Sequence, residues 1–458
     1  KIGLPSGGQG LYPDSLVKEC LHWNKIYRVG PGLRNLGNTC FLNATLQCLA
    51  YLPPLAQHLL EGIYSQGPQG VASRGHRPMG GGREFRKVEI MAVIEQHTKQ
   101  VHQGRGAGLG AISPKVVVQN LRMIGKQFRL GRQEDAHEFL RHLLDKMVDC
   151  CLKRRGVKSS APNRLAETTP INRIFGGYLR SQLKCLSCGH CSDTFDPFLD
   201  LSMELSGGVR SLDSALHRFT AKETLDAGNR WRCGGCQKLV RAEKRLTVFK
   251  PPNALVVHLK RFIFARKAAK VKHHVQFGEQ LELRVSGPER SARYDLTGVV
   301  VHAGGSMSSG HYYAYVRSSS GIWAQMDDTS VSKVKQQTVL NDQAYLLFYT
   351  RRPAPLPLPP KLPPAAAAVA AAPPLVFSGA APAASKGAGS SVAASRKLSF
   401  EAPPNGPAAR SRGDANISVG NGAVGKISVG KGDTGGARAG DVDQSAPAAN
   451  ALTSAAAT

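Results

Sequence analysis

The chain has 458 residues, 41% of them hydrophobic, so it can bury a sizeable core in roughly two or three domains of ordinary size. Its 60 lysines and arginines against 32 aspartates and glutamates give a formal net charge of +28. Such an excess attracts polyanions such as RNA or acidic protein surfaces, although an inert basic surface has the same composition. No apolar run is long enough to span a membrane and no secretory hydrophobic stretch opens the chain, which predicts a soluble intracellular protein.

Composition divides the chain into three parts. Residues 1–31 are predicted to be a leader that ends in a Gly-Pro-Gly turn, and Lys1 in place of Met suggests part of a longer protein. Residues 32–350 have the composition of a folded domain. Residues 351–458 are rich in Pro, Ala and Gly with few aromatics, and such a segment buries too little apolar surface to offset its ordering entropy. We therefore predict a disordered tail.

The first half of the folded region reads as helices separated by loops. Apolar residues recur at helical spacing over Phe41–Leu52, and Pro53-Pro54 is predicted to end that helix. A second, amphipathic helix is predicted over Gln133–Cys151. The glycine-rich residues 67–82 and the segment Lys153–Pro170 are predicted loops.

The second half reads as strands. Apolar, β-branched and aromatic runs bounded by turn residues predict four of them, at Leu255–Leu259, Tyr294–Ala303, His311–Val316 and Ala344–Tyr349. Helices first and strands later predict an α+β fold.

Cys40 is the candidate nucleophile. It follows Asn38-Thr39, two good N-cap residues, so we expect it at a helix N-terminus, where the dipole and free N–H groups favour the thiolate. Gly37 permits a tight turn there, and Asn35 could point its amide at a developing oxyanion. The alternative is an unreactive buried cysteine, the commoner fate of a single Cys.

His311 is the candidate base. It lies in GGSMSSGHYYAYV, where a glycine-rich loop meets a strand, and the segment Trp323–Asp328 follows it. A carboxylate from that segment could accept the Nδ1–H of His311 and hold its tautomer. Cys, His and Asp far apart in sequence are the layout expected of papain-like chemistry. Since the chain has 14 histidines, the three segments together carry the prediction, not His311 alone.

Two Cys-x-x-Cys pairs predict a structural zinc site. Four thiolates at this spacing give tetrahedral Zn²⁺ with no open position, whereas a disulfide framework does not fit the scattered remaining cysteines. The alternatives are four unrelated thiols, or competition from the neighbouring His190 and Cys191. The predicted ligands are Cys185, Cys188, Cys233 and Cys236.

At these residues the chain resembles the ubiquitin-specific protease family (peptidase C19). GLRNLGNTCFLNATLQCL resembles the family's Cys box, QEDAHEFL its central acidic motif, and LVVHLKRF, HAGGSMSSGHYYAYV, WAQMDDTSV and AYLLFY its His box, in the family's order. The resemblance covers roughly Gly32 to Thr350. It implies a papain-like cysteine protease with a helical thumb, a mixed palm and zinc-bearing β-ribbon fingers at about 176–250. The implied activity is hydrolysis of the isopeptide bond after the C-terminal Gly of ubiquitin.

The resemblance also implies roles for individual residues. Asp327 becomes the third member of a triad, and Asp328 supports the oxyanion or nearby backbone. Asp135 and Glu138 grip the two arginines of the ubiquitin tail, and we expect Asp135 to act on the substrate with little effect on thermal stability. The alternative is that both acids only suit the helix dipole. The substrate-binding residues implied are Gln133, Asp135, Glu138, Gly310 and Tyr312.

Within the family, LHWNKIYRVG and IFGGYLRSQLKCLSC resemble ubiquitin carboxyl-terminal hydrolases 36 and 42, which implies a nuclear and nucleolar location. The basic runs Lys153–Lys158 and Phe264–His274 are candidate nuclear signals or RNA contacts. Three alternatives stay open: an inactive ubiquitin-binding scaffold, a nucleic-acid-binding protein with a zinc ribbon, and a protease for another ubiquitin-like modifier.

Overall fold

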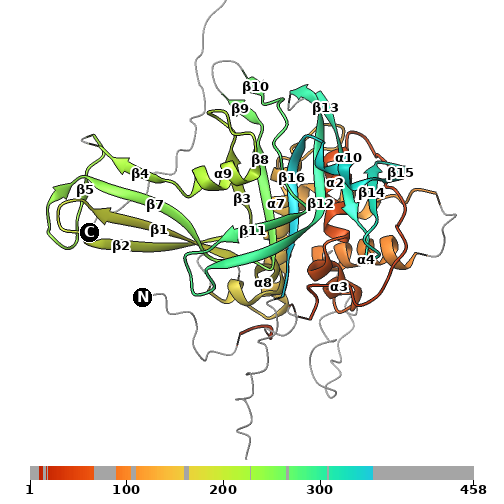
Figure 1. Cartoon of the computed structure of the whole chain (residues 1–458). Coiled ribbons are helices and arrows are strands. Elements are labelled where there is room, and N and C mark those ends of the chain that lie inside the picture. The colour runs from red at the N-terminus through yellow and green to blue at the C-terminus, as the bar shows by residue number, and fades with distance from the viewer. Residues whose placement is uncertain are drawn as a thin grey trace, which may run out of the picture. The chain divides into compact units, whose positions relative to one another are not determined.

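The computed structural model describes residues 10–13, 17, 19–65, 89–104, 110–158, 164–226, 228–264, 268–306 and 309–353, without the side chains of 263, 264, 268, 269 and 306. These residues form an α+β fold with a helical region, a large mixed sheet and a separate β-ribbon, so the predicted fold class is confirmed (Figure 1). The predicted glycine-rich loop and residues 354–458 of the predicted tail lie outside the described residues, whereas Arg351, the first residue of that tail as predicted, still belongs to the last strand.

The helices of the thumb follow the predicted pattern with shifted ends. Pro53 and Pro54 end the first helix, but they also occupy the first turn of the next one, where a missing N–H costs nothing. The predicted loop from Lys153 is partly wrong, because the second long helix runs on to Arg154 and a 3-10 turn follows. The elements are α2 (Cys40–Ala50), α3 (Pro53–Leu60), α4 (Ile90–Gln103), α5 (Lys115–Gln119), α6 (Leu121–Ile124), α7 (Ala136–Arg154), η2 (Arg164–Thr168) and α8 (Pro170–Phe175).

The palm is an eight-stranded sheet in the order β15-β14-β13-β12-β16-β8-β3, with β11 also paired to β12. Only the β3–β8 pair is parallel, so the sheet is mixed, and all four predicted strands lie in it. Its strands are β3 (Leu201–Glu204), β8 (Ala254–Lys260), β11 (Gln280–Arg284), β12 (Ser291–Ser306), β13 (Ser309–Arg317), β14 (Trp323–Asp327), β15 (Ser330–Val334) and β16 (Ala344–Arg351), and the helices α9 (Leu212–Phe219) and α10 (Gln336–Leu340) accompany them.

Both faces of the palm are covered, which explains its continuous apolar strands. Side chains alternate along a strand, so Val256 and Phe348 join the core shared with the thumb helices. Their neighbours Val257 and Leu347 join a second core on the opposite face. Strands buried on both sides read as uninterrupted apolar runs and not as alternating ones.

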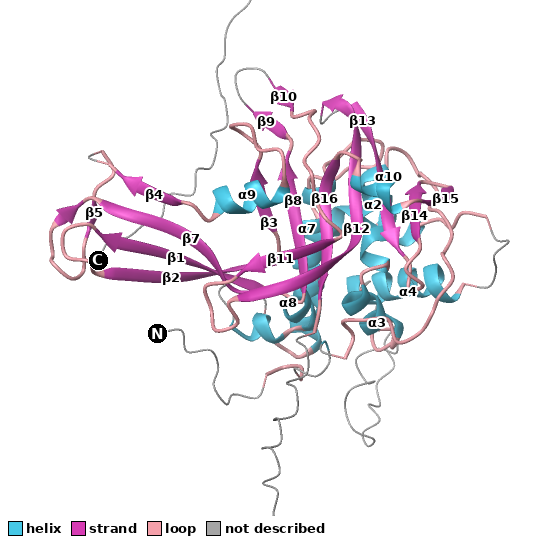
Figure 2. Cartoon of the chain, in the orientation of Figure 1, coloured by secondary structure: helices cyan, strands magenta, loops and turns pink. Residues whose placement is uncertain are grey.

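The fingers are a four-stranded antiparallel ribbon in the order β2-β1-β7-β4, which extends away from the palm (Figure 2). A short pair of strands at its far end, β5–β6, carries one of the Cys-x-x-Cys pairs on its connection. The second small pair, β9–β10, belongs to the palm side. The strands are β1 (Gly177–Cys185), β2 (Cys191–Phe198), β4 (Lys222–Leu225), β5 (Trp231–Arg232), β6 (Leu239–Val240), β7 (Ala242–Lys250), β9 (Phe262–Phe264) and β10 (Ala268–Lys270).

Part of the predicted leader packs against the thumb. Tyr12 and Val17 are buried in the first core. The backbone N–H of Gly30 donates to the hydroxyl of Tyr51 at 2.6 Å, and the amide of Gln57 donates to two carbonyls of the segment 20–22. Described residues before position 32 therefore contribute to the folded unit.

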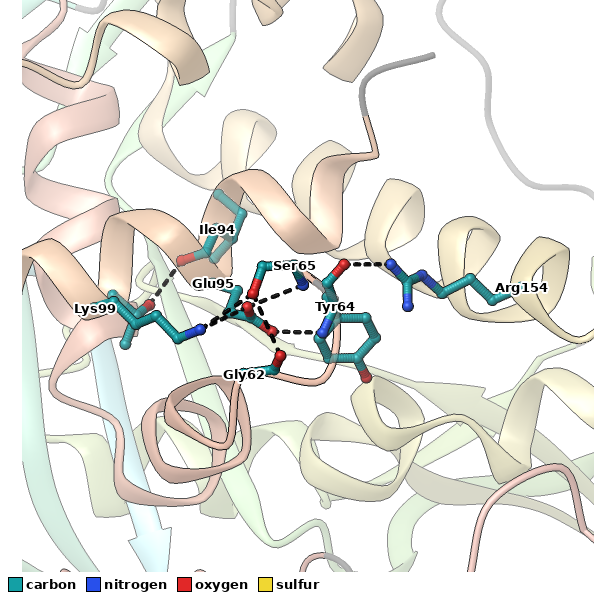
Figure 3. A network of polar contacts seen from close by, with 8 residues as sticks. Gly62, Tyr64, Ser65, Ile94, Glu95, Lys99 and Arg154 are labelled. Carbon is teal, nitrogen blue, oxygen red and sulfur yellow. Dashed lines mark hydrogen bonds and ion pairs between the residues drawn. The ribbon is translucent and has the colours of Figure 1, made fainter. Parts of the chain in front are cut away.

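A buried carboxylate fixes the connection after α3. Glu95 on α4 accepts the backbone N–H groups of Tyr64 at 2.6 Å and Ser65 at 3.0 Å, and the ammonium of Lys99 at 2.9 Å (Figure 3). Burial alone would raise the pKa of Glu95, but these donors together hold it below its usual value. Arg154, from α7, donates to the carbonyl of Tyr64 and so ties the same segment to a third helix.

None of the described helices is both long and apolar enough to cross a membrane.

Candidate active site and zinc knuckles

Cys40 is the first residue of α2, and its thiol is buried where the helix packs against the palm. Gly37 has φ +106° and Asn38 has φ +53°, which makes the sharp turn before the helix. The side-chain oxygen of Asn35 accepts the backbone N–H groups of Gly37 and Thr39, both at 3.1 Å. The turn is therefore held from within the Cys box, and it sets Cys40 at the helix start as predicted.

The electrostatics of Cys40 differ from the prediction. Burial raises the pKa of its thiol above the ordinary value, the backbone N–H of Tyr312 lowers it, and the charge of Asp328 raises it. Among the described residues, no hydrogen bond joins this thiol to His311. The helix start therefore does not by itself favour the thiolate as expected, because burial raises the pKa by more than the backbone N–H groups lower it. Ionisation of Cys40 therefore needs a base.

His311 on β13 and Asp327 on β14 lie on adjacent antiparallel strands. The imidazole Nε2 and the Oδ1 of Asp327 are 2.6 Å apart, and each side chain is 40% exposed. The prediction that the carboxylate holds Nδ1 is wrong, since Nε2 is the nitrogen on Asp327. Nδ1 is then the ring nitrogen left to take a proton from the nucleophile.

Asp328, the next residue, turns away to the Cys box. Its φ is +46°, and its backbone carbonyl accepts the N–H of Leu33 at 2.7 Å. Its carboxylate accepts the amide N–H groups of Asn35 at 2.9 Å and Asn43 at 2.8 Å. Two neighbouring carboxylates thus have separate partners: one holds the imidazole, and the other holds the amide that faces the turn of Cys40. Asn43 was not predicted, although it lies in the same motif one helical turn after Cys40.

Gln133 and Gly310 bind each other reciprocally. The amide of Gln133 donates to the carbonyl of Gly310 at 2.8 Å, and its side-chain oxygen accepts the N–H of Gly310 at 2.9 Å. These residues lie 177 positions apart: Gln133 is two residues before the N-cap of α7, and Gly310 directly precedes His311 on β13. The contact joins the thumb to the strand that carries the base.

Asp135 is engaged inside the fold. It is the N-cap of α7, and its Oδ1 accepts the N–H of Glu138 at 2.9 Å. Its Oδ2 accepts the hydroxyl of Tyr312 at 3.4 Å and that of Tyr345. Burial, and then the charge of Asp135, raise the pKa of both tyrosines. The sequence interpretation gave Asp135 a role on the substrate alone and missed these structural contacts.

Glu138 is more accessible than Asp135. Its side chain is 48% exposed and accepts the amide of Gln127 at 3.0 Å. It lines a cavity of about 750 Å³ beside the turn of Cys40, together with Glu134, which the sequence analysis did not single out. Glu134 stands beside Asp135 in QEDAHEFL, so its place in the acidic motif was the available signal. The remaining lining residues are Asn38, Gln127, Gly131, Arg132 and Gln133.

The four predicted zinc ligands converge at the far end of the fingers. Their sulfur atoms all lie within 4.8 Å of one another, and those of Cys188 and Cys233 are 3.7 Å apart. Tetrahedral thiolates at about 2.3 Å from zinc lie roughly 3.8 Å apart, so the cluster fits the metal. Backbone N–H groups donate to the sulfurs of Cys185 at 3.4 Å and Cys233 at 3.3 Å, which favours thiolates. Cys191 is exposed, and its thiol donates to a carbonyl outside the cluster.

A family model described as "Ubiquitin carboxyl-terminal hydrolase" matches residues 31–349. The chain belongs to this family. It is 44% identical to ubiquitin carboxyl-terminal hydrolase 23 of Arabidopsis thaliana over 71% of this chain and 36% of that protein. It is 39% identical to ubiquitin carboxyl-terminal hydrolase 42 of Homo sapiens, over 75% of this chain and 25% of that protein. For the probable ubiquitin carboxyl-terminal hydrolase 16 of Schizosaccharomyces pombe the identity is 38%, over 75% of this chain and 71% of that protein.

Solved structures of the family have the same fold. The SAGA Ubp8/Sgf11/Sus1/Sgf73 DUB module bound to ubiquitin aldehyde is 26% identical, with a TM-score of 0.58 over 70% of both chains. A related DUB module bound to monoubiquitin is 27% identical, with a TM-score of 0.59 over 70% of this chain and 69% of that one. The predicted ubiquitin-specific protease resemblance and architecture are thereby confirmed. The chain spans about a third of the length of the Arabidopsis relative and about a quarter of the length of the human one.

The two predicted basic runs are partly used inside the fold. Arg154 pairs with Glu89 and with a backbone carbonyl, and the guanidinium of Arg155 lies over the ring of Tyr12, 4.6 Å from its centre. Lys270, in the second run, donates to two carbonyls of β12. Arg154 and Lys270 are thus engaged within the fold, and RNA contact stays a prediction without support from these contacts.

Proposed function

We propose that this chain is a ubiquitinyl hydrolase of the cysteine type, which cleaves the isopeptide bond after the C-terminal Gly of ubiquitin on protein substrates. The observation that supports it most is the His311–Asp327 pair at 2.6 Å on β13 and β14, the strands against which α2 packs with the buried Cys40 thiol at its start. Solved relatives bound to ubiquitin aldehyde and to monoubiquitin point to the same substrate.

The residues present account for each proton. His311 takes the proton of Cys40 through Nδ1, and Asp327 stabilises the imidazolium through Nε2. The thiolate attacks the carbonyl carbon of the ubiquitin glycine, and the carbonyl oxygen takes up the electron pair of the C=O π bond and becomes an oxyanion. His311 then gives its proton to the departing lysine amine, which leaves a thioester on Cys40. Water, deprotonated by His311, hydrolyses the thioester and frees both ubiquitin and the enzyme.

Asn35 is placed to meet the oxyanion. Its amide oxygen fixes the Cys40 turn, and Asp328 holds its NH₂ group, so the side chain has no freedom to rotate away. A donor fixed before the reaction costs no reorganisation when charge develops. Removal of one such donor typically costs about 10²–10³-fold in kcat.

The acidic rim beside Cys40 suits the arginines of a ubiquitin tail. Glu138 and Glu134 line that cavity, and Glu138 is nearly half exposed. Gln133 also lines this cavity and joins the thumb to Gly310 on the palm, so the tail would pass this contact on its way to the thiol. Zinc bound by Cys185, Cys188, Cys233 and Cys236 would have no open coordination position, so it would hold the fingers and take no part in the chemistry.

The experiment is hydrolysis of C-terminal fluorogenic substrates of ubiquitin and of other ubiquitin-like modifiers. We expect Cys40→Ala to remove activity and to keep ubiquitin binding, since losing one member of a triad costs several orders of magnitude. Cys48→Ala, at a buried thiol on the same helix, is the matched control and should keep activity.

The outcome separates the proposal from its rivals. Binding of ubiquitin without hydrolysis by the unaltered chain would indicate an inactive scaffold. Faster hydrolysis of another modifier would reassign the substrate, and near-normal turnover by Cys40→Ala would remove Cys40 as nucleophile.

For location, we propose the nucleus with a nucleolar component. The support is the net charge of +28 and the location that the resemblance of the sequence motifs implies. Diffuse cytoplasmic fluorescence of the tagged full chain would contradict it.

A further inference from the structure

The strand that faces the catalytic histidine runs on beyond its partner. β12 pairs with β16 only as far as Val301, opposite Ala344, where β16 begins. It continues along β13, with His302 opposite Tyr312 and Ala303 opposite His311. On its other edge, none of the described strands pairs with the residues that follow Val301. His302 is buried, so its carbonyl needs a partner other than water, and the same partner can also hold the exposed residues that follow it.

Lys270 is that partner. It lies at the end of β10, and its ammonium donates to the carbonyls of His302 at 2.7 Å and Gly304 at 2.8 Å. Its third contact is the Nδ1 of His302 at 3.0 Å. A lysine ammonium has three N–H donors, and all three are used on two residues of β12. The two carbonyls that it holds flank Ala303, the residue directly opposite His311.

The space around this contact is tight. A Cβ at Gly310 would collide with the ring of His302, and one at Gly304 would lie 2.5 Å from the Cα of Gly310. The His302 ring is 2% exposed and packs edge-on against Tyr312, with ring centres 4.6 Å apart. A shift of the β12 end therefore reaches Gly310 and Tyr312, the two neighbours of His311 in the chain.

We infer that Lys270 is a positioning residue for catalysis: by holding the carbonyls of His302 and Gly304 it fixes the β12 end against which His311 is aligned with Asp327. The inference rests on the proposed hydrolase activity and deepens it. Among the contacts of the described residues, Lys270 touches neither the thiol of Cys40 nor the imidazole of His311, so it acts through β12. Gln133, on the thumb side, holds Gly310 directly, whereas Lys270 holds the β12 end.

The test compares Lys270→Met, Lys270→Arg and the matched control Lys272→Met, an exposed lysine two positions along the same segment. Ubiquitin hydrolysis is measured for kcat and KM, and alkylation of Cys40 by iodoacetamide is followed by mass spectrometry. Misplacing a reacting group by about 1 Å can cost on the order of 10²-fold, so Lys270→Met should lower kcat by roughly 10- to 100-fold. KM should change less than about twofold, because Lys270 lies off the acidic rim.

Alkylation of Cys40 near neutral pH should slow in Lys270→Met, since proton transfer to His311 generates the thiolate. Lys270→Arg, which can still donate to both carbonyls, should restore most of kcat, and Lys272→Met should match the unaltered chain. Unchanged kcat and alkylation in Lys270→Met would overturn the inference. So would a result in which Lys270→Met and Lys270→Arg lose thermal stability and kcat to the same degree, because the loss of kcat would then follow from unfolding. An unaltered chain that does not hydrolyse ubiquitin would refute the proposed function, and the alkylation comparison would still decide the role of Lys270.

Discussion

Replacing Asp135 should lower the free energy of unfolding of the chain. The sequence motif implies the opposite, a role on the substrate with little effect on stability. In Asp135→Ala, α7 loses an N-cap bond of 2.9 Å, which is worth about 1 kcal/mol. The hydroxyl of Tyr345 loses a charged acceptor, which is worth about 1.5–3 kcal/mol, and the 3.4 Å contact of Tyr312 adds little. The free energy of unfolding should therefore fall by about 2.5–4 kcal/mol. Asp135→Asn keeps a capping oxygen and one acceptor, so its loss should be about 1 kcal/mol.

The assay is urea unfolding, followed by a kinetic cycle with ubiquitin whose two tail arginines are replaced. The matched control is Glu138→Gln, which removes an exposed charge from the same helix turn. It should leave stability within about 0.5 kcal/mol and lower kcat/KM by roughly tenfold, the cost of a charge-assisted bond. Its loss should not add to the loss from the altered ubiquitin, whereas that of Asp135→Ala should add.

An unfolding free energy for Asp135→Ala within about 1 kcal/mol of the unaltered chain, with a non-additive cycle, would refute this reasoning. It would return Asp135 to direct contact with the substrate.

Three further predictions follow from other sites. Asp327→Asn should keep more activity than Asp327→Ala in ubiquitin hydrolysis, since an amide still orients Nε2; equal and severe losses would show that the charge itself is needed. Cys185→Ser should release zinc, about one atom per chain by elemental analysis, and loosen the fingers, whereas exposed Cys191→Ser should keep it; full activity without zinc would argue against a structural role. Burial lowers the pKa of His97 to about 4 against about 6.5 unfolded, so its contribution is complete above pH 6.5 and is lost as pH falls toward 4, by up to about 3 kcal/mol. His97→Phe should flatten that part of the urea-unfolding profile, and an unchanged slope would assign it to other groups.

The sequence determined the parts that depend on short spacing. A thiol after Asn38-Thr39 begins a helix because the turn is closed by Asn35, four residues before Thr39. Each Cys-x-x-Cys pair makes its own knuckle, and the apolar runs of β8 and β16 predict buried strands whatever lies beside them. These features follow from residues only a few positions apart, so backbone geometry and burial reveal them without the rest of the chain.

Only the tertiary structure decided which atoms meet. The nitrogen of His311 that faces Asp327 depends on how β13 and β14 align, and the partners of Asp135 lie 177 and 210 positions away. Lys270 lies in a basic run that was predicted as a nuclear signal or an RNA contact. Its ammonium instead binds two backbone carbonyls of β12. A side chain's type restricts its possible partners, but the choice among distant ones belongs to strand register and helix packing, which bring those groups within hydrogen-bonding distance.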